Sequence, residues 1–465
     1  MMRSSWHALL IFLLLFITVT TKAQQSLIAG KALTYAGQTL KVYVYSDFLT
    51  LREKLIAKTK IDAAGNFKVT IPINYTQFIF IKTDISRSSF YVEPSKNYFV
   101  SIPKLAPEEI PSLGVQGYAP IKISSADSME LNTLISKFED YLDNFYKKNL
   151  ALIARKAIKK EASLFRSALE KRFSHVSNTY FKSYIKYKLA TLEAAGGSSK
   201  LHLYKTYFSS TIQYSSLEYM QFFSQTYTRY LKQLAGTTKG SAIEPAISSK
   251  KNYAAAMKGI QKADTLFSND TLCELLLLKG LNEYYYQPKS NKRSIESLLS
   301  YIEKNGKGAE NKKIAHNTLA LLTLLTAGTQ SPGFSLPDAR GKLVRLSDFK
   351  GKYVYLDFWA TWCLPCLQEL KLKQALFEKY GEDIVFVSIS IDKTASIMNS
   401  YLLKNKQLTS VFLFGGASET LLDDYNIKAI PTYFLLDREG DIIESPAKKP
   451  SENAELVFKS LLKIN

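Results

Sequence analysis

The alternation of hydrophobic and polar residues changes its period along the chain and so divides the chain into regions of different structure. Between residues 24 and 103 apolar side chains recur at every second position in short runs, such as Leu40, Val42 and Val44. A period of two is that of a β-strand with one buried face, and turn residues such as those at 93–95 separate the runs. We therefore predict a small antiparallel β domain of the sandwich type over residues 24–103.

A helical period follows a short connection. Residues 104–123 contain several prolines and glycines and are predicted to be a linker. From residue 124 to 328 apolar residues recur at three- and four-residue steps, beginning at Leu131 behind Asp127 as the expected N-cap. This pattern predicts an all-helical domain built from helix pairs with short loops. The expected helices cover residues 131–145, 164–192, 201–234, 254–267, 272–286, 295–302 and 315–325.

Two residue types in the helical region allow both a functional and a structural interpretation. Tyrosines such as Tyr184, Tyr187 and Tyr207 could line a binding groove, but at helical spacing they are more often partly buried packing residues. Cys273 lies in an apolar helical run, where a cysteine usually behaves as a small buried hydrophobe. We expect packing roles for both.

Strands and helices alternate in the last region, residues 329–465. Crossover helices between apolar strands predict an α/β layer fold with a partly parallel sheet, and the turn at 437–440 predicts an antiparallel edge. The chain is thus predicted to be multidomain, with an N-terminal antiparallel β domain, an all-helical middle domain and a C-terminal α/β domain. The expected strands are 353–358, 384–391, 411–414, 432–436 and 442–444, and the expected helices are 363–380, 396–404 and 452–462.

Residues 1–23 have the pattern of a secretory signal peptide. Arg3 precedes an apolar run from residue 8 to 19, and a small residue, Ala23, ends the segment. The run is too short to span a bilayer, and no comparable run follows, so we expect an exported chain without a transmembrane segment in its mature part. The periplasm of a bacterium is the expected location, and an uncleaved anchor is the alternative.

The positive charge of the chain is concentrated in its helical part. The net charge is +20, and residues 124–330 contain 30 basic and 17 acidic residues, whereas residues 331–465 contain 17 of each. A basic surface favours acidic partners, lipid head groups or polyanionic glycans, although lysines spread over helices more often form a solvated face. No motif of a nucleic-acid-binding module is present, so we expect no nucleic acid partner.

Two of the three cysteines, Cys363 and Cys366, are separated by two residues at the start of a predicted helix. Three cysteines in an exported chain of 465 residues do not make a disulfide scaffold, so the pair is expected to do chemistry. A helix N-terminus lowers the pKa of a thiol, which makes Cys363 the expected nucleophile. Cys366 lies one turn on and can resolve a mixed disulfide, while Pro365 fits the first turn.

The segment Tyr-Leu-Asp-Phe-Trp-Ala-Thr-Trp-Cys-Leu-Pro-Cys, residues 355–366, resembles the active-site segment of thioredoxins. The elements at 334–338 and 346–351 and the extra helix and strand within 391–414 make the region more similar to the membrane-tethered or periplasmic thioredoxin-like proteins of cytochrome c maturation, the TlpA/ResA-type redoxins. The resemblance covers residues 331–465, under a third of the chain, and implies a thioredoxin-like fold.

This resemblance also implies roles for individual residues. Ile430-Pro431 matches the cis-proline of the family, with the Ile430 backbone facing an extended substrate, and Trp362 and Pro365 complete the expected substrate-binding set. Asp357 matches the buried carboxylate beneath the cysteines. Burial should raise its pKa and let it accept the proton that Cys366 loses. The Leu-Pro dipeptide between the cysteines lacks the glycine of reducing thioredoxins and leaves the redox potential open.

Two rival site chemistries do not fit the residues. Peroxiredoxins need a threonine and a proline at the positions held by Ala360 and Leu356. A zinc site would need further ligands near the cysteines, but His175, His202 and His316 all lie in the helical region, so no metal is expected. A binding or scaffold protein with an auxiliary redox domain stays open, because the first two domains carry no recognisable chemistry.

We therefore expect an exported thiol-disulfide oxidoreductase that mainly reduces protein disulfides. Its redox group is the Cys363–Cys366 disulfide, with no other cofactor. Because exported compartments are oxidising, the enzyme needs an external thiol electron donor. Protein disulfides or thiols are the expected substrates, and the basic helical domain is the candidate site for an acidic partner.

Overall fold

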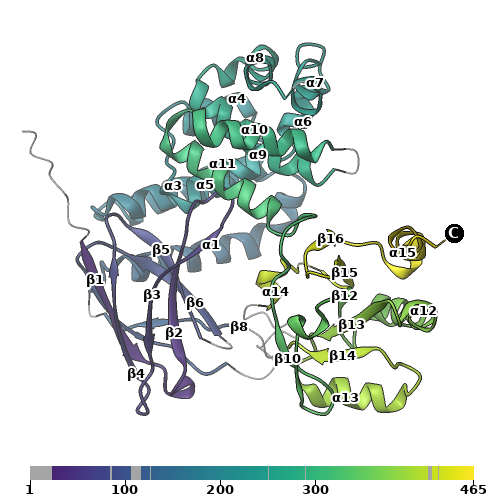
Figure 1. The fold of residues 1–465 in the computed structure, drawn as a ribbon. Helices are drawn as coiled ribbons and strands as arrows, with labels where there is room; N and C mark the ends of the chain where they lie inside the picture. The colour runs from purple at the N-terminus through teal and green to yellow at the C-terminus, as the bar shows by residue number, and fades with distance from the viewer. Residues whose placement is uncertain are drawn as a thin grey trace, which may run out of the picture.

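A computed structural model of the chain describes residues 24–83, 86–105, 117–125, 127–249, 251–287, 290–416, 421–427 and 429–464. The predicted signal peptide, residues 1–23, lies outside the described residues. Figure 1 shows β-strands at the lower left, helices above them and an α/β domain at the right. The predicted multidomain fold class is therefore confirmed.

The β domain consists of two facing sheets with strand orders β4-β1-β7-β9 and β3-β2-β5-β6-β8. Most pairs are antiparallel, while β1–β7 and β6–β8 are parallel. Leu40 and Val42 point into the core between the sheets, as the alternation predicts. The strands are β1 (Gln25–Lys31), β2 (Thr39–Tyr45), β3 (Glu53–Lys60), β4 (Asn66–Pro72), β5 (Gln77–Lys82), β6 (Ser86–Val92), β7 (Asn97–Ser101), β8 (Gly117–Tyr118) and β9 (Lys122–Ile123).

Strands β8 and β9 lie within residues 104–123, which the prolines and glycines had marked as a linker. β8 pairs with β6 and β9 pairs with β7, so this stretch returns to an edge of each sheet. A free sheet edge supplies unpaired N–H and C=O groups, which such short strands satisfy. The end of the predicted linker therefore belongs to the β domain.

The middle region is helical, as predicted, but the two longest predicted helices, 164–192 and 201–234, are each divided, the second among α4, α5 and α6. The predicted helix at 164–192 is divided between α2 and α3, because the Asn178 side chain accepts from the Phe181 N–H and starts a new helix. Glu130, rather than Asp127, caps α1. The helices are α1 (Leu131–Ala154), α2 (Lys159–Arg172), α3 (Thr179–Ala195), α4 (Lys200–Leu203), α5 (Leu217–Thr226), α6 (Tyr230–Ala235), α7 (Ile243–Ser248), α8 (Tyr253–Ala263), α9 (Asp270–Tyr285), α10 (Lys292–Asn305) and α11 (Gly308–Thr323).

Tyrosines fill the core of the helical region. Tyr187, Tyr207 and Tyr219 are buried and their rings pack against one another or against Phe222, which accords with a packing role.

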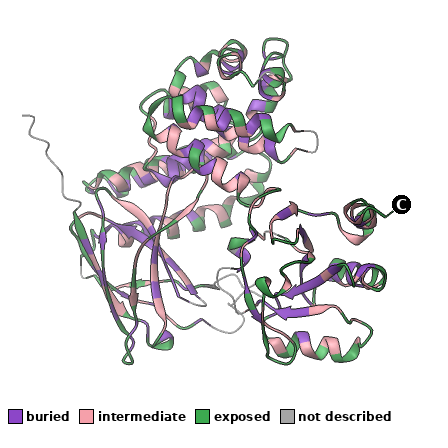
Figure 2. Ribbon diagram, in the orientation of Figure 1, coloured by how far each residue is buried: buried purple, intermediate pink, exposed green. Residues whose placement is uncertain are grey.

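Cys273 is fully buried, and burial raises the pKa of its thiol to about 12. A thiol held neutral in this way is inert in disulfide exchange. Figure 2 shows buried residues where the helices face each other and between the two sheets.

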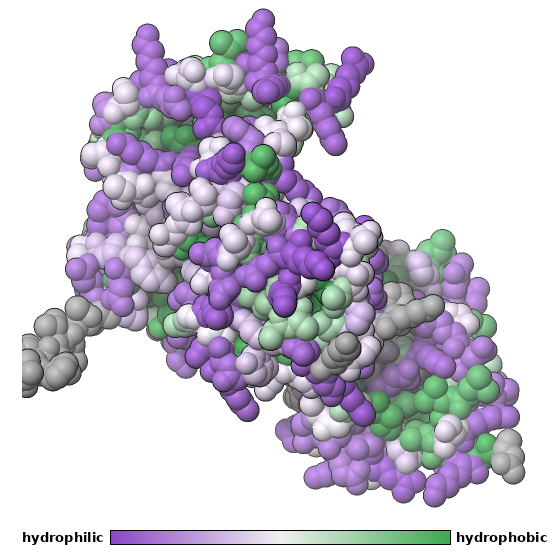
Figure 3. All heavy atoms as spheres, turned by 90° about the horizontal axis from the view of Figure 1, so that it is seen from above, coloured by the Kyte–Doolittle hydropathy of each residue, from purple (hydrophilic) through white to green (hydrophobic). Residues whose placement is uncertain are grey.

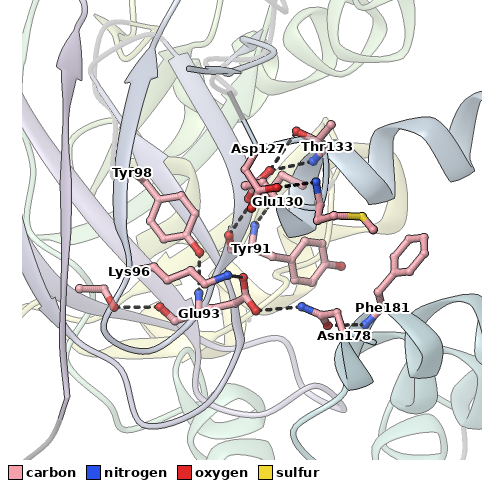
Figure 4. Close-up of polar contacts among 12 residues, drawn as sticks. Tyr91, Glu93, Lys96, Tyr98, Asp127, Glu130, Thr133, Asn178 and Phe181 are labelled. Atoms are coloured by element: carbon pink, nitrogen blue, oxygen red, sulfur yellow. Dashed lines mark hydrogen bonds and ion pairs between the residues drawn. The ribbon is translucent and has the colours of Figure 1, made fainter. Parts of the chain in front are cut away.

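Polar contacts join the β domain to the helical region. Figure 4 shows Glu93, which follows strand β6. The Glu93 carboxylate forms an ion pair with Lys96 and accepts a hydrogen bond of 2.9 Å from the Asn178 side chain at the start of α3. On the other side, Asn132 of α1 exchanges hydrogen bonds of 2.7 and 2.8 Å with the backbone of Tyr91. These bonds fix the first helices against the sheet, so the two domains form one unit.

The C-terminal domain is a five-stranded sheet of order β14-β13-β12-β15-β16 with buried clusters on both faces. β12 pairs in parallel with β13 and antiparallel with β15, and the predicted hairpin joins β15 to β16. The elements are β10 (Ser335–Pro337), β11 (Leu343–Arg345), β12 (Tyr353–Trp359), α12 (Leu364–Tyr380), β13 (Ile384–Ser390), α13 (Ala395–Lys404), β14 (Val411–Phe414), α14 (Leu421–Asp424), β15 (Thr432–Leu436), β16 (Ile442–Glu444) and α15 (Ala454–Leu462).

The connection from α11 to this domain is docked on the domain that it enters. Gly328 donates to the carbonyl of Ile442 at 2.7 Å, and Ser331 donates to that of Gly440 at 3.1 Å.

Seen from above, hydrophilic side chains cover much of the helical region, and apolar ones gather on the visible face of the C-terminal domain, at the lower right of Figure 3. In the part of the chain that the structure describes, every helix is too short or too polar to cross a membrane.

Replacing Asn317 with alanine should destabilise the β–helical unit without affecting the C-terminal domain. The buried Asn317 side chain on α11 donates to Asp47 at 2.7 Å and to Ser46 at 2.8 Å and accepts from Arg52, all in the β domain. Loss of these bonds should cost about 1–3 kcal/mol.

The two parts can be followed separately in a protein that begins at Gln24, because its tryptophans, Trp359 and Trp362, both lie in the C-terminal domain. The urea transition followed by far-ultraviolet circular dichroism should move to lower concentration, while the tryptophan transition stays. Asn305→Ala, an exposed change on α10, is the matched control. A shift of the tryptophan transition, or none in either signal, contradicts the prediction.

Candidate active site of the C-terminal domain

The cysteine pair lies where the central strand feeds the longest helix of the domain. Strand β12 ends at Trp359, and Cys363 is the N-cap of α12, with its sulfur accepting from the Cys366 N–H at 3.3 Å. The two sulfurs form a disulfide of 2.07 Å. Cys363 is 6% exposed and Cys366 is 1% exposed. An incoming group therefore reaches Cys363 first.

Local sequence explains this geometry. The apolar strand β12 is buried and ends in a turn that the Cys363 N–H closes on the Ala360 carbonyl at 3.1 Å. Pro365 occupies the first turn of α12, where its missing N–H leaves no helical bond unmade. The Cys366 N–H and the positive end of the helix dipole then face the Cys363 sulfur and favour its thiolate.

Asp392, which the sequence reasoning missed, holds the turn before Cys363 from behind. Its buried carboxylate accepts from the N–H and hydroxyl of Thr361, the latter at 2.8 Å, and from the Ser390 hydroxyl at 2.7 Å. Its signal was present in the sequence, because an acidic residue lies two positions after the end of the apolar strand β13. The end of a parallel strand is where side chains of neighbouring strands meet.

The loop before β15 forms the other wall of the site. The Ile430–Pro431 peptide bond is cis, and the Ile430 carbonyl oxygen lies 3.9 Å from the Cys363 sulfur. Trp362 and Leu364 beside the cysteine are 51% and 66% exposed, and Pro365 is exposed as well. The cysteine pair, Ile430 and Pro431 are thus brought together from segments far apart in the chain, with an apolar rim around Cys363.

Asp357 lies in the middle of β12 and is 1% exposed. Its Oδ1 atom binds the ammonium group of Lys373 and accepts from the Ser388 hydroxyl at 2.8 Å. Its other oxygen, Oδ2, is buried and has no hydrogen-bond partner among the described residues. The hydrogen bonds of Asp357 thus go to these two residues rather than to either cysteine.

Burial governs the ionisation of this pair. Removal from water raises the pKa of Asp357, and the nearby Lys373 ammonium lowers it in part. The pKa of Lys373 is lowered by its own burial. A carboxyl group whose pKa is raised in this way keeps its proton to higher pH than a carboxyl group in water.

Sequence reasoning did not single out Lys373, although a signal existed. Lys373 stands two turns after Cys366 on the face of α12 that also carries Leu370, so a cation interrupts an apolar helical stripe. A buried lysine needs a partner, and the only acidic residue of the adjacent strand β12 is Asp357.

No group of three or more His, Cys, Asp or Glu side chains placed to hold a metal occurs among the described residues.

Replacing Lys373 with methionine should raise the pKa of Asp357 further, because burial would then act without the compensating cation. The midpoint should rise by at least about one pH unit, which corresponds to about 1.4 kcal/mol. An acid whose pKa is higher in the folded than in the unfolded state binds protons on folding. The variant should therefore lose stability as the pH rises from the unfolded-state pKa of Asp357 through its folded-state pKa.

The midpoint can be read from the carboxyl carbon resonance of Asp357 in the oxidised protein. Lys371→Met is the matched control, because Lys371 is exposed on the same helix. An unchanged midpoint in the Lys373 variant, or an equal rise in both variants, would show that Lys373 does not set the ionisation of Asp357.

Comparison with known proteins covers this same part of the chain. The Redoxin family model matches residues 326–458. The thiol-disulfide oxidoreductase ResA of Bacillus thuringiensis subsp. konkukian is 31% identical over 136 residues, which are 29% of this chain and 78% of the relative. ResA of Bacillus subtilis is 31% identical over 144 residues, 30% of this chain and 77% of the relative.

Among solved structures, a thiol:disulfide interchange protein from a Bacteroides species is 26% identical and covers 30% of this chain and 91% of its own, with a TM-score of 0.27. The family assignment does not depend on that superposition, since it follows from the ResA relatives, whose identity lies above 30% over more than three quarters of their length. Through its C-terminal domain, the chain belongs to the ResA-like family of thiol-disulfide oxidoreductases.

Proposed function

We propose that the chain is an exported reductase of protein disulfides that works through a mixed disulfide on Cys363. The observation that carries the proposal is the difference between the two cysteines: Cys363 lies at the helix N-terminus beside the Ile430 carbonyl and is the more exposed, while Cys366 is buried behind it. The Cys363 sulfur is placed for attack on a substrate disulfide, and the Cys366 sulfur is placed for attack on the Cys363 sulfur.

In the first step, the reduced Cys363 thiolate attacks one sulfur of a substrate disulfide. A bond forms between Cys363 and that sulfur, the substrate S–S bond breaks, and its second sulfur leaves as a thiolate that takes a proton from water. The exposed Trp362 and Leu364 supply apolar contact for the chain around the disulfide, and the backbone of Ile430 lies where an extended substrate segment would pair.

In the second step, Cys366 attacks the Cys363 sulfur and releases the first substrate sulfur. Cys366 must lose its proton, and we assign Asp357 as the acceptor, since its raised pKa lets it hold a proton in the buried interior. The substrate gains two electrons, and the cysteine pair becomes the disulfide seen in the structure. An external thiol donor must then supply two electrons to restore the dithiol.

The direction and the location follow from physical conditions rather than from the site itself. An exported compartment keeps disulfides oxidised, so a dithiol enzyme there reduces its substrates only while a donor renews it. The signal-peptide pattern of residues 1–23 supports export, and the periplasm is the compartment in which such a donor relay operates. Proteins with disulfides are the proposed substrates.

Replacing Cys366 with serine should trap substrates on Cys363. The first step proceeds, but without the second thiol the mixed disulfide accumulates, and non-reducing electrophoresis of a periplasmic extract with mass spectrometry identifies what is bound. Cys363→Ser is the matched control and should trap nothing. Equal trapping by both variants, or an extract from which neither captures protein, counts against the assigned roles, as does an unaltered protein that fails to reduce insulin with a thiol donor.

Replacing Asp357 with asparagine should slow the second step more than the first. General-base assistance typically contributes about 100-fold or more, so release of the mixed disulfide should slow by roughly that factor near neutral pH and recover at high pH, where Cys366 ionises unaided. Stopped-flow measurement of the two steps separates them. Asp383→Asn, an exposed change in the same domain, is the control; equal slowing of both steps would point to a structural role for Asp357.

A further inference from the structure

The turn between α1 and α2 and the helix ends beside it, residues 147–164, form a basic surface that we call the α1–α2 tip. The sequence of the tip has one acidic residue, Glu161 in the first turn of α2, and from residue 144 to 160 it has no aspartate or glutamate. In the part of the chain that the structure describes, the basic side chains of the tip make no ion pair, whereas Arg166 and Lys188 nearby do. The exposed basic residues of the tip are Lys147, Lys148, Arg155, Lys156, Lys159 and Lys160.

Two of these cations, Lys159 and Lys160, lie where they do not stabilise their own helix. Lys159 and Lys160 are the first two residues of α2, where the positive end of the helix dipole disfavours a cation and an acidic residue would be the stabilising choice. Six like charges within one turn and its flanking residues also repel one another. Helix stability therefore accounts for Arg155 and Lys156, which follow the last residue of α1 at the negative end of its dipole, but not for Lys159 and Lys160.

The tip is a rigid platform. Phe145 of α1 and Phe165 of α2 stack with their ring centroids 4.3 Å apart, and Ile158 in the turn is fully buried. The Ala157 N–H closes the turn on the Leu152 carbonyl at 2.8 Å, and the Lys156 N–H closes it on that of Ile153 at 3.0 Å. The charges are thus displayed on a preformed surface, so binding would require little ordering of the backbone.

Two leucines lie among these charges. Leu150 is 66% exposed and Leu164 is 64% exposed. Isolated exposed leucines are common, but here they flank a cluster of cations at the end of a helix pair. Basic residues combined with exposed large apolar side chains are the pattern by which helices lie in the interface of an anionic bilayer.

We propose that the α1–α2 tip docks on an anionic lipid bilayer, with its lysines and arginine at the head groups and Leu150 and Leu164 at the boundary of the acyl chains. Charge complementarity favours an anionic surface, and the leucines favour a lipid over a polyanionic glycan, which offers no apolar phase for them to enter. This goes beyond the proposed redox function and does not depend on it.

The test uses the protein that begins at Gln24, so that the apolar run of residues 8–19 cannot contribute. Sedimentation with phosphatidylcholine vesicles containing about one third phosphatidylglycerol should show binding that phosphatidylcholine alone does not support. Changing Lys147, Lys148, Lys159 and Lys160 to glutamine should weaken binding at least about 50-fold, since each basic residue near such a surface contributes roughly fivefold. Circular dichroism checks that the variants keep their fold.

The matched control removes the same charge from the β domain through Lys54, Lys58, Lys60 and Lys68, all exposed and changed to glutamine. It should bind nearly as well as the unaltered protein. A second variant, Leu150→Ser with Leu164→Ser, should bind at least about threefold more weakly, and the difference should persist at high salt, because lost apolar contact is not screened.

Four outcomes would overturn the proposal. These are no binding to anionic vesicles, equal loss in the tip and control variants, unchanged binding in the leucine variant, or retention of the protein on immobilised heparin without binding to vesicles. Failure to bind anionic vesicles, with or without retention on heparin, would exclude a bilayer as the binding partner. Equal loss in the tip and control variants would mean that net charge alone explains the binding. Unchanged binding in the leucine variant would show that the leucines do not contribute to it.

Discussion

Burial of strand β12 between two hydrophobic layers is the constraint on which the redox site depends. The clusters on the two faces of the sheet leave no solvent beside this strand, so any polar side chain on it must find a partner inside the domain. Asp357 forms an ion pair with Lys373 and a hydrogen bond with Ser388. The strand ends just before the turn from which α12 begins. Strand, helix and charge pair are thereby placed by the same packing.

A buried ion pair is seldom retained for stability alone. Taking a carboxylate and an ammonium from water costs free energy that their attraction only partly returns, and two apolar residues of similar size would pack at least as well. The Asp357 Oδ2 atom adds a further cost, because it is buried without a hydrogen bond in the described structure. The proton-acceptor role proposed for Asp357 would give this energetic cost a function.

The rest of the chain is organised differently. The β and helical domains are joined by buried polar contacts, such as those of Asn317 and Asn132, whereas the connection after α11 is bonded to the C-terminal domain. The redox domain therefore follows a unit of two joined domains that carries most of the excess positive charge. This division places the cysteine chemistry and the basic surface on separate parts of the molecule.

The sequence alone predicted five strands and three helices of the C-terminal domain to within about two residues at each end, because a buried strand and a capped helix are governed by local hydrophobic period, Pro365 and the cysteine spacing. It predicted neither the short strands β10 and β11 nor the four-residue helix α14. It also identified Asp357 and Ile430-Pro431, through the resemblance of their motifs. It overextended the helices at 164–192 and 201–234, which side-chain caps such as those of Asn178 and Ser216 divide into shorter helices. It did not predict the strands β8 and β9, whose two-residue pairing carries no pattern. Only the tertiary structure showed that Lys373 meets Asp357 and that Asp392 holds Thr361, because ion pairs and hydrogen bonds between distant elements depend on packing, which local sequence does not encode.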